Sequence, residues 1–145
     1  MRLVIGSDHG GVALKSRIMH FLEQTRPDIT LINIGTDTDA SVDYPDFARK
    51  GVSVILEGKA DAGILICGTG LGISMMANRF KGIRAAVVHD VFTAEMSKAH
   101  NNANILCLGG RTTDPELAST LVRTWLETKF EGGRHQSRID KLDQD

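Results

Sequence analysis

The stretch that decides the fold is "ILICGTGLGIS", residues 64–74. Its apolar beginning is typical of a buried β-strand, and a loop with glycines at alternate positions follows directly. The apolar spacing after the loop predicts a helix over residues 71–80. A buried strand, a tight glycine turn and a helix form the repeating unit of an α/β protein with a parallel sheet.

The same alternation runs along the whole chain of 145 residues. Apolar runs predict strands at residues 3–5, 29–34, 62–66, 83–88 and 104–108. Helices are expected at residues 12–23, 45–56, 71–80, 94–99, 114–130 and 134–142, the second of them capped by Asp43. The predicted fold class is therefore α/β: a single doubly wound, three-layer domain over residues 1–145 with a five-stranded, parallel, Rossmann-like sheet.

Composition and charge exclude several classes of protein. The net charge of −1 and the isoelectric point near 6.5 give no overall basic field for nucleic acid or an anionic membrane. No apolar run reaches the roughly 20 residues that span a bilayer, and the apolar N-terminal run breaks after Gly6. Cys67 and Cys107 lack a CxxC or metal-type spacing. We expect a cytoplasmic protein that uses neither metal nor cofactor.

Chemically capable side chains follow three of the predicted strands. Ligands of open parallel sheets bind beyond the carboxyl ends of the strands, where strand order reverses. Residues 7–9, with Asp8 and His9, follow the first strand, residues 67–72 follow the third, and Arg111 follows the fifth. His100 and Asn101 end the helix before the fifth strand, and we expect them at the same edge.

The glycine loop suits an anion. Gly68, Gly70 and Gly72 allow backbone N–H groups to point into a cavity, and the helix from Leu71 aims its positive end the same way. A phosphate, a carboxylate or a developing oxyanion fits such a loop. A dinucleotide-binding site is a second interpretation, and an acidic residue, Asp90, lies about 20 residues further on as such sites require. The loop, however, lacks the third glycine of the GxGxxG pattern. A tight turn without a ligand is a third.

Cys67 stands at the mouth of this loop. A thiol beside a helix N-terminus ionises more readily, and the thiolate is a base or a nucleophile. The alternative is a buried cysteine that acts as a small apolar residue. For Cys107, inside "NILCL", the pattern favours that alternative.

The basic residues near the end of the chain suit a phosphate. Arg134 and Arg138 are four apart, so they share one face of a short helix that also carries His135. With Arg111 they offer three guanidinium groups to a dianion. The alternative is a solvent-exposed helix face of mixed charge, because several aspartates follow these arginines in the sequence. In addition, a helix at the end of the chain need not reach the strand ends of its own chain.

His100 and Tyr44 also have two interpretations each. An imidazole at His100 suits general acid or base chemistry, but it is also a suitable cation at a helix C-terminus. Tyr44, the only tyrosine, either packs against the body of the domain or reaches into the site.

Five segments together resemble a known family. They are "GSDHGG" (6–11), "DYPDFA" (43–48), "GILICGTGLGIS" (63–74), "AHNNANILCLGGR" (99–111) and "EGGRHQSRI" (131–139). In this order and spacing the chain is similar to the type B ribose-5-phosphate isomerases and their relatives, the galactose-6-phosphate isomerase subunits. The resemblance covers nearly the whole chain.

The resemblance implies interconversion of ribose 5-phosphate and ribulose 5-phosphate through an enediol(ate), without metal or nucleotide. Cys67 would be the base, and His100 would open the sugar ring or donate a proton with help from Asp8. The implied catalytic residues are Cys67, His100, Thr69 and Asp8. The implied substrate- and phosphate-binding residues are Asp8, His9, Gly68, Thr69, Gly70, Leu71, Gly72, Asn101, Arg111, Arg134 and Arg138. Ile73 stands where other members carry a glutamate, which places this chain in the cysteine-using branch.

The resemblance also implies self-association. The family forms homodimers, sometimes paired into tetramers, and the C-terminal helix at about residues 134–142 would reach the site of a neighbouring subunit. Two alternatives stay open: an isomerase of six-carbon phosphates (allose 6-phosphate or galactose 6-phosphate), and an inactive sugar-phosphate sensor. The presence of Cys67 and His100 argues against the sensor.

Overall fold

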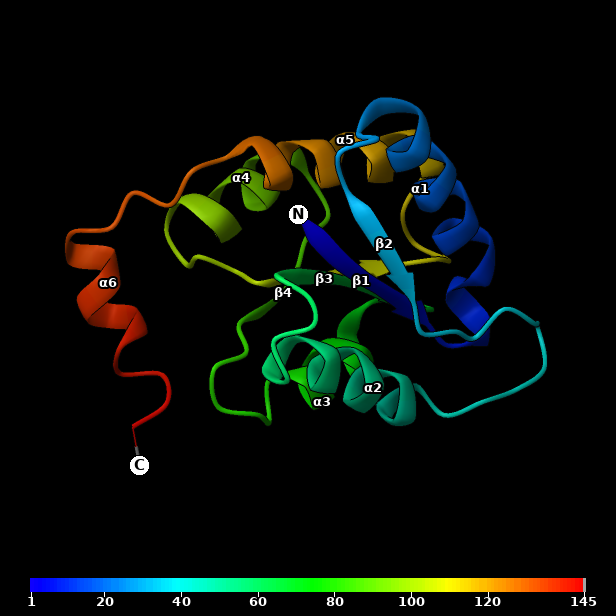
Figure 1. Cartoon of the computed structure of the whole chain (residues 1–145), viewed down its shortest axis with the longest axis horizontal. Coiled ribbons are helices and arrows are strands. Elements are labelled where there is room, and N and C mark those ends of the chain that lie inside the picture. Colours follow the sequence, from blue (N-terminus) through cyan, green and yellow to red (C-terminus); the bar gives the residue numbers. More distant parts are fainter. Residues whose placement is uncertain (145) are drawn as a thin grey trace.

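Five parallel strands form the central sheet (Figure 1), in the order β2-β1-β3-β5-β4. The structure is a computed structural model, and it describes residues 1–144. The strands are β1 (Arg2–Ser7), β2 (Thr30–Asn33), β3 (Ala62–Cys67), β4 (Ala85–Val87) and β5 (Ile105–Gly109). The predicted five-stranded parallel sheet is confirmed.

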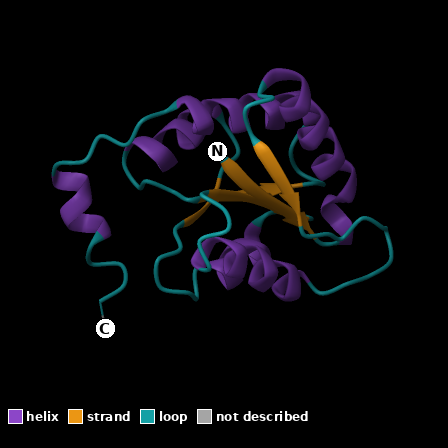
Figure 2. Cartoon of the chain, in the orientation of Figure 1, coloured by secondary structure: helices purple, strands orange, loops and turns teal. Residues whose placement is uncertain are grey.

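Helices cover both faces of the sheet, as Figure 2 shows, so the predicted three-layer arrangement is confirmed as well. On one face lie α1 (Val12–Thr25), α4 (Val91–Ala99) and α5 (Pro115–Glu127), and on the other lie α2 (Tyr44–Leu56) and α3 (Leu71–Ala77). A single 3₁₀ turn, η1 (His9–Gly11), precedes α1, and a short helix, α6 (Arg134–Ile139), stands beside the layers. Within residues 1–144, no helix has the length and apolar character needed to cross a membrane.

Strand β3 lies in the middle of the core. All six of its residues are buried, because β1 and β5 pair with its two edges and helices cover both its faces. Strands buried on both faces are continuous apolar runs rather than alternating ones, which explains why "AGILIC" was recognisable as a strand. The edge strands β2 and β4 are only partly buried.

Strand order reverses between β1 and β3. From β1 the chain turns into α1 on one face, whereas from β3 it turns into α3 on the opposite face. The two loops therefore diverge above the carboxyl ends of these strands, which is where open parallel sheets bind ligands. The fold thus places Asp8 and Cys67 on either side of this point.

Capping explains several helix starts. Asp90 and Asp114 accept hydrogen bonds from backbone N–H groups in the first turns of α4 and α5. Asp43 holds the N-cap position of α2, as expected, but its side chain makes no capping hydrogen bond. Helix α3 ends at Ala77, three residues before the predicted end.

Trp125 tests the packing of α5 on the sheet. The indole is fully buried, and its Nε1–H donates to the carbonyl of Ala103 at 3.0 Å. Trp125→Phe removes this donor and leaves a void, so we expect the free energy of unfolding to fall by about 1–3 kcal/mol. Urea unfolding followed by far-UV circular dichroism measures the change. Phe92→Leu, on an exposed aromatic, is the control, and an equal loss in both variants would contradict the explanation.

Candidate active site

The loops after β1, β3 and β5 are tied together by backbone hydrogen bonds. The Asp8 N–H donates to the Ile66 carbonyl at 3.1 Å, and the N–H groups of Gly110 and Arg111 donate to the carbonyls of Cys67 and Gly68 at 2.8 and 2.9 Å. The structure therefore brings together the three groups of residues that the sequence placed after these strands.

Cys67 ends β3 with its thiol at the glycine loop. The side chain is buried, and its Sγ accepts a hydrogen bond from the Gly70 N–H at 3.2 Å. This geometry depends on Gly70, whose φ of +81° turns the loop back toward the sulfur. Cys107 differs: it is fully buried within β5, and burial raises the pKa of its thiol, so it acts as an apolar residue, as expected.

Arg111 and Tyr44 lie against the glycine loop. A Cβ added at Gly68 would stand 3.0 Å from Nη1 of Arg111, so the guanidinium packs directly over this glycine. A Cβ at Gly72 would stand 2.7 Å from Cζ of Tyr44, so the phenol ring packs on the first turn of α3. Tyr44 therefore both packs against the domain and borders the site, with 40% of its surface exposed.

Asp8 and His9 lie in the loop after β1, which packs against the glycine loop, since a Cβ added at Gly10 would stand 3.2 Å from Cα of Gly68. The Asp8 carboxylate is buried, and its Oδ1 accepts the Gly10 N–H at 2.9 Å. The Nδ1 of His9 accepts the Val42 N–H at 3.2 Å, which leaves Nε2 as the ring nitrogen able to donate to a ligand. Val42 comes from the loop between β2 and α2, so this loop is part of the site.

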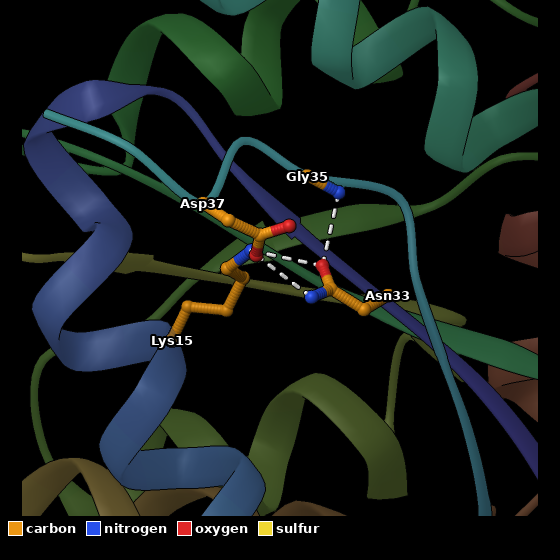
Figure 3. A network of polar contacts seen from close by, with 4 residues as sticks. All are labelled: Lys15, Asn33, Gly35 and Asp37. Carbon is orange, nitrogen blue, oxygen red and sulfur yellow. Dashed lines mark hydrogen bonds and ion pairs between the residues drawn. The ribbon is translucent and has the colours of Figure 1, made fainter. Parts of the chain in front are cut away.

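A buried lysine anchors that loop (Figure 3). Lys15 in α1 is 2% exposed, and its Nζ donates to Oδ1 of Asn33 at 2.8 Å and to Oδ1 of Asp37 at 2.7 Å. Asn33 closes the network by donating to Asp37 and accepting the Gly35 N–H. Sequence reasoning missed Lys15, and its only signal was a charged residue next to the apolar face of a helix.

His100 and Asn101 lie at the opposite edge of the sheet, so the expectation that they share the edge of Cys67 is wrong. His100 is the C-cap of α4, and four residues later the Asn104 carbonyl accepts the N–H of Gly63, at the beginning of β3. A helix that leads into a parallel strand ends at the amino edge of the sheet. His100 is therefore separated from Cys67 by about the length of β5, roughly 15 Å.

The arginines of α6 accompany His100 rather than Cys67. Figure 1 shows α6 at one end of the molecule, while β1 and β2 point toward the other. Arg138 lines a hollow of about 220 Å³ together with His100, Asn101 and His135. Arg134 begins α6, after the glycine pair 132–133. The predicted residues thus form two groups at opposite edges of one chain.

Glu131 and His135 lie beside His100, and the sequence analysis assigned neither of them a role. The rings of His100 and His135 stack with centroids 4.1 Å apart, and Oε1 of Glu131 lies 3.6 Å from Nε2 of each. Burial, with the charges of His100 and Arg134, lowers the pKa of His135. The signal for this pair was a glutamate and a histidine four residues apart.

Asp90 caps helix α4, so it does not support the interpretation of the glycine loop as a dinucleotide site. Its Oδ1 accepts the Thr93 N–H at 2.7 Å, and Thr93 bonds back to the Asp90 N–H, which forms a capping box. Asp90 also follows the edge strand β4, with β5 between it and the glycine loop.

Comparison with known proteins gives full-length matches. Residues 3–142 match the family described as Ribose/Galactose Isomerase. Ribose-5-phosphate isomerase B of Escherichia coli is 41% identical over 142 residues, which cover 97% of this chain and 93% of that protein. The structure of ribose-5-phosphate isomerase B from Clostridium thermocellum is 49% identical with a TM-score of 0.95, covering 98% of this chain and 95% of that one. The ribose 5-phosphate isomerase from Thermotoga maritima is 47% identical with a TM-score of 0.96, covering 99% and 98%.

Lys15→Met tests the anchored loop. The substitution keeps the aliphatic volume and removes the ammonium donor, so we expect the free energy of unfolding at neutral pH to fall by about 1–2 kcal/mol, limited by the exposure of Asp37. The hydrogen bond from Lys15 holds the pKa of Asp37 below its ordinary value. The pair therefore contributes fully above about pH 4, and its contribution is lost as the pH falls through the folded-state pKa.

Urea unfolding of wild type and Lys15→Met, at neutral pH and at about pH 2–3, measures this difference. The difference between the two proteins should shrink at low pH, and a constant difference would contradict the ion-pair explanation. Lys59→Met breaks an ion pair with Glu57 that is exposed on both sides, so this control should show no measurable change.

Proposed function

Since this chain belongs to the ribose/galactose isomerase family and is a sugar phosphate isomerase, we propose that it interconverts ribose 5-phosphate and ribulose 5-phosphate. The observation that carries the proposal is the buried Cys67 thiol, held on the Gly70 N–H between the loops of Asp8 and Arg111. A proton acceptor, anion-binding backbone and a cation then lie together at the carboxyl edge of the sheet.

The proposed reaction moves one proton between adjacent carbons. The Cys67 thiolate takes the proton from C2 of the open-chain aldose, and the negative charge moves to the C1 oxygen. The hydroxyl proton on O2 then passes to O1, and the proton held by Cys67 returns to C1. The hydrogen bond from the Gly70 N–H stabilises the negative charge on the sulfur whenever Cys67 is a thiolate, before it takes the proton and after it returns it. Such a base contributes typically about 10²–10⁴-fold in rate.

The remaining loop residues stabilise and exchange charge in this proposal. The N–H groups of Gly70 and Leu71 are bonded to Cys67 Sγ and Thr69 Oγ1, so the other backbone N–H groups of residues 68–72 face the enediolate oxygen in this proposal. One such donor is worth about 10²–10³-fold. Thr69 and Asp8 exchange the hydroxyl protons in this proposal, because Thr69 follows Cys67 in the glycine loop and the Asp8 N–H is bonded to Ile66, the residue before Cys67. His9 and Arg111 bind the phosphate end.

The other half of the proposed machinery must come from a second copy of the chain. His100 opens the sugar ring, Asn101 binds the substrate, and Arg134 and Arg138 hold the phosphate in this proposal. His100 and Asn101 lie roughly 15 Å from Cys67 in their own chain, at the far edge of the sheet, and Arg138 lines the same hollow as they do. A homodimer with shared sites, alone or paired into a tetramer, joins the two groups. The glycine pair 132–133 sets α6 off from the body of the domain, as reaching a neighbour requires.

An isomerase of six-carbon phosphates is the second candidate, because the matching family includes galactose isomerases by its description. Turnover of ribose 5-phosphate, allose 6-phosphate and galactose 6-phosphate, compared as kcat/KM, decides between the candidates. The highest value is expected for ribose 5-phosphate.

Cys67→Ala tests the base. Conversion of ribose 5-phosphate in the presence of EDTA should continue in the wild type and fall by about 10²-fold or more in the variant. Cys107→Ala is the matched control, because that thiol is fully buried in β5, and its kcat should be unchanged. Unchanged turnover in Cys67→Ala would assign the base elsewhere. Binding without turnover in the wild type would support the sensor.

Mixing two inactive variants tests the shared site. Cys67→Ala and His100→Asn are each expected to be inactive, but mixed dimers contain one site with both residues intact. Unfolding and refolding an equal mixture should therefore restore about a quarter of the wild-type activity, because random pairing makes about half of the dimers mixed. Each variant refolded alone is the control. A mixture as inactive as its components would contradict sites shared between copies.

A further inference from the structure

The imidazole rings of His100 and His135 stack face to face where α4 ends beside α6. The ring centroids are 4.1 Å apart, and the ring planes are inclined by 13°. His135 is 7% exposed and is the only buried residue of α6, so this short helix packs against the rest of the chain chiefly through that side chain. The stack forms within one chain, so it is in place before a second copy is added.

The stack is the contact that sets the plane of the His100 ring. Oε1 of Glu131 lies 3.6 Å from Nε2 of His100, which is too long for a good hydrogen bond. The His100 side chain is 38% exposed, so its own surroundings in α4 leave the ring room to rotate. The flat face of His135 permits only orientations of His100 that are close to parallel to it. A catalytic imidazole needs such a neighbour, because proton transfer requires a fixed line between donor and acceptor.

We propose that His135 is a positioning residue, which holds the His100 imidazole in the orientation that opens the sugar ring. This inference rests on the proposed function, in which His100 of one copy faces the sugar beside Cys67 of the other. In ring opening the C1–O4 bond breaks, O4 gains a proton, and the O1 hydroxyl loses one as the carbonyl forms. His100 gives the first proton and takes the second only when its ring nitrogens point at these oxygens.

The charges around His135 keep it out of this proton transfer. Burial, with the charges of His100 and Arg134, lowers the pKa of His135. The Arg138 guanidinium acts in the same direction, and the Glu131 carboxylate opposes it. The His135 ring is therefore uncharged at neutral pH. It supports the His100 ring without competing with it for the proton.

Two substitutions separate the stack from a simple loss of packing. His135→Leu removes the flat ring, whereas His135→Phe keeps a flat ring without any nitrogen. We expect kcat for ribose 5-phosphate to fall by about tenfold or more in His135→Leu, and to stay within about threefold of the wild type in His135→Phe. His20→Leu is the control, because this histidine is exposed on α1, and its kcat should be unchanged.

Hydrogen exchange at C1 separates ring opening from the later proton transfer. Ribulose 5-phosphate has no furanose form, because its O5 carries the phosphate, so Cys67 exchanges the C1 proton with solvent without help from His100. Deuterium incorporation into ribulose 5-phosphate in D₂O, followed by NMR at early times, should therefore keep its wild-type rate in His135→Leu. An equal fall in exchange and in turnover would overturn the proposal. Full turnover of ribose 5-phosphate in His135→Leu, or an equal loss in His135→Phe, would overturn it as well.

A spectroscopic measurement tests the stack without any substrate. The NMR resonance of the Cε1–H group of His100, assigned by its absence in His100→Asn, lies in the ring current of His135. This resonance should shift in His135→Leu, and an unchanged resonance would contradict the positioning role. A wild type that is inactive on ribose 5-phosphate, but whose resonance responds in this way, would contradict the proposed function and still support the positioning of His100.

Discussion

The hydrogen bonds that join the ends of β1, β3 and β5 fix the candidate site. Strand β3 lies between the other two and is buried along its whole length, so the position of Cys67 is fixed by the core. The Gly110 and Arg111 N–H groups then tie the next loop to the carbonyls of Cys67 and Gly68. The thiol that we propose as the base is thereby held by the core of the protein, while the groups around it come from loops.

The loops reach this position because the polar groups that anchor them are satisfied. Lys15 is buried, and its ammonium is bonded to Asn33 and Asp37 where β2 ends. A buried ammonium without partners would be strongly unfavourable, so the network fixes the path of the loop that follows. That loop brings Val42 to His9 and Tyr44 to the glycine turn. Stability and function therefore depend on the same contacts.

The direction of the crossover connections divides the proposed machinery. Loops that leave strands collect at the carboxyl edge, and helices that return to strands end at the amino edge, so Cys67 and His100 cannot meet within one chain. In the proposed dimer, the carboxyl edge of one copy lies against the amino edge of the other. The same division gathers His100, Glu131 and His135 into one cluster at the amino edge of the sheet.

The sequence by itself determined the type and order of the strands and helices, because hydrophobic periodicity and capping act over a few residues. It also located Asp8, Cys67 and Arg111, since residues that follow parallel strands share an edge whatever the details of packing. Only the tertiary structure decided that His100 lies at the amino edge of the sheet. It also decided that Lys15 contacts Asp37 and that Glu131 contacts His100. Those contacts join residues 22 and 31 positions apart, and packing alone sets such distances.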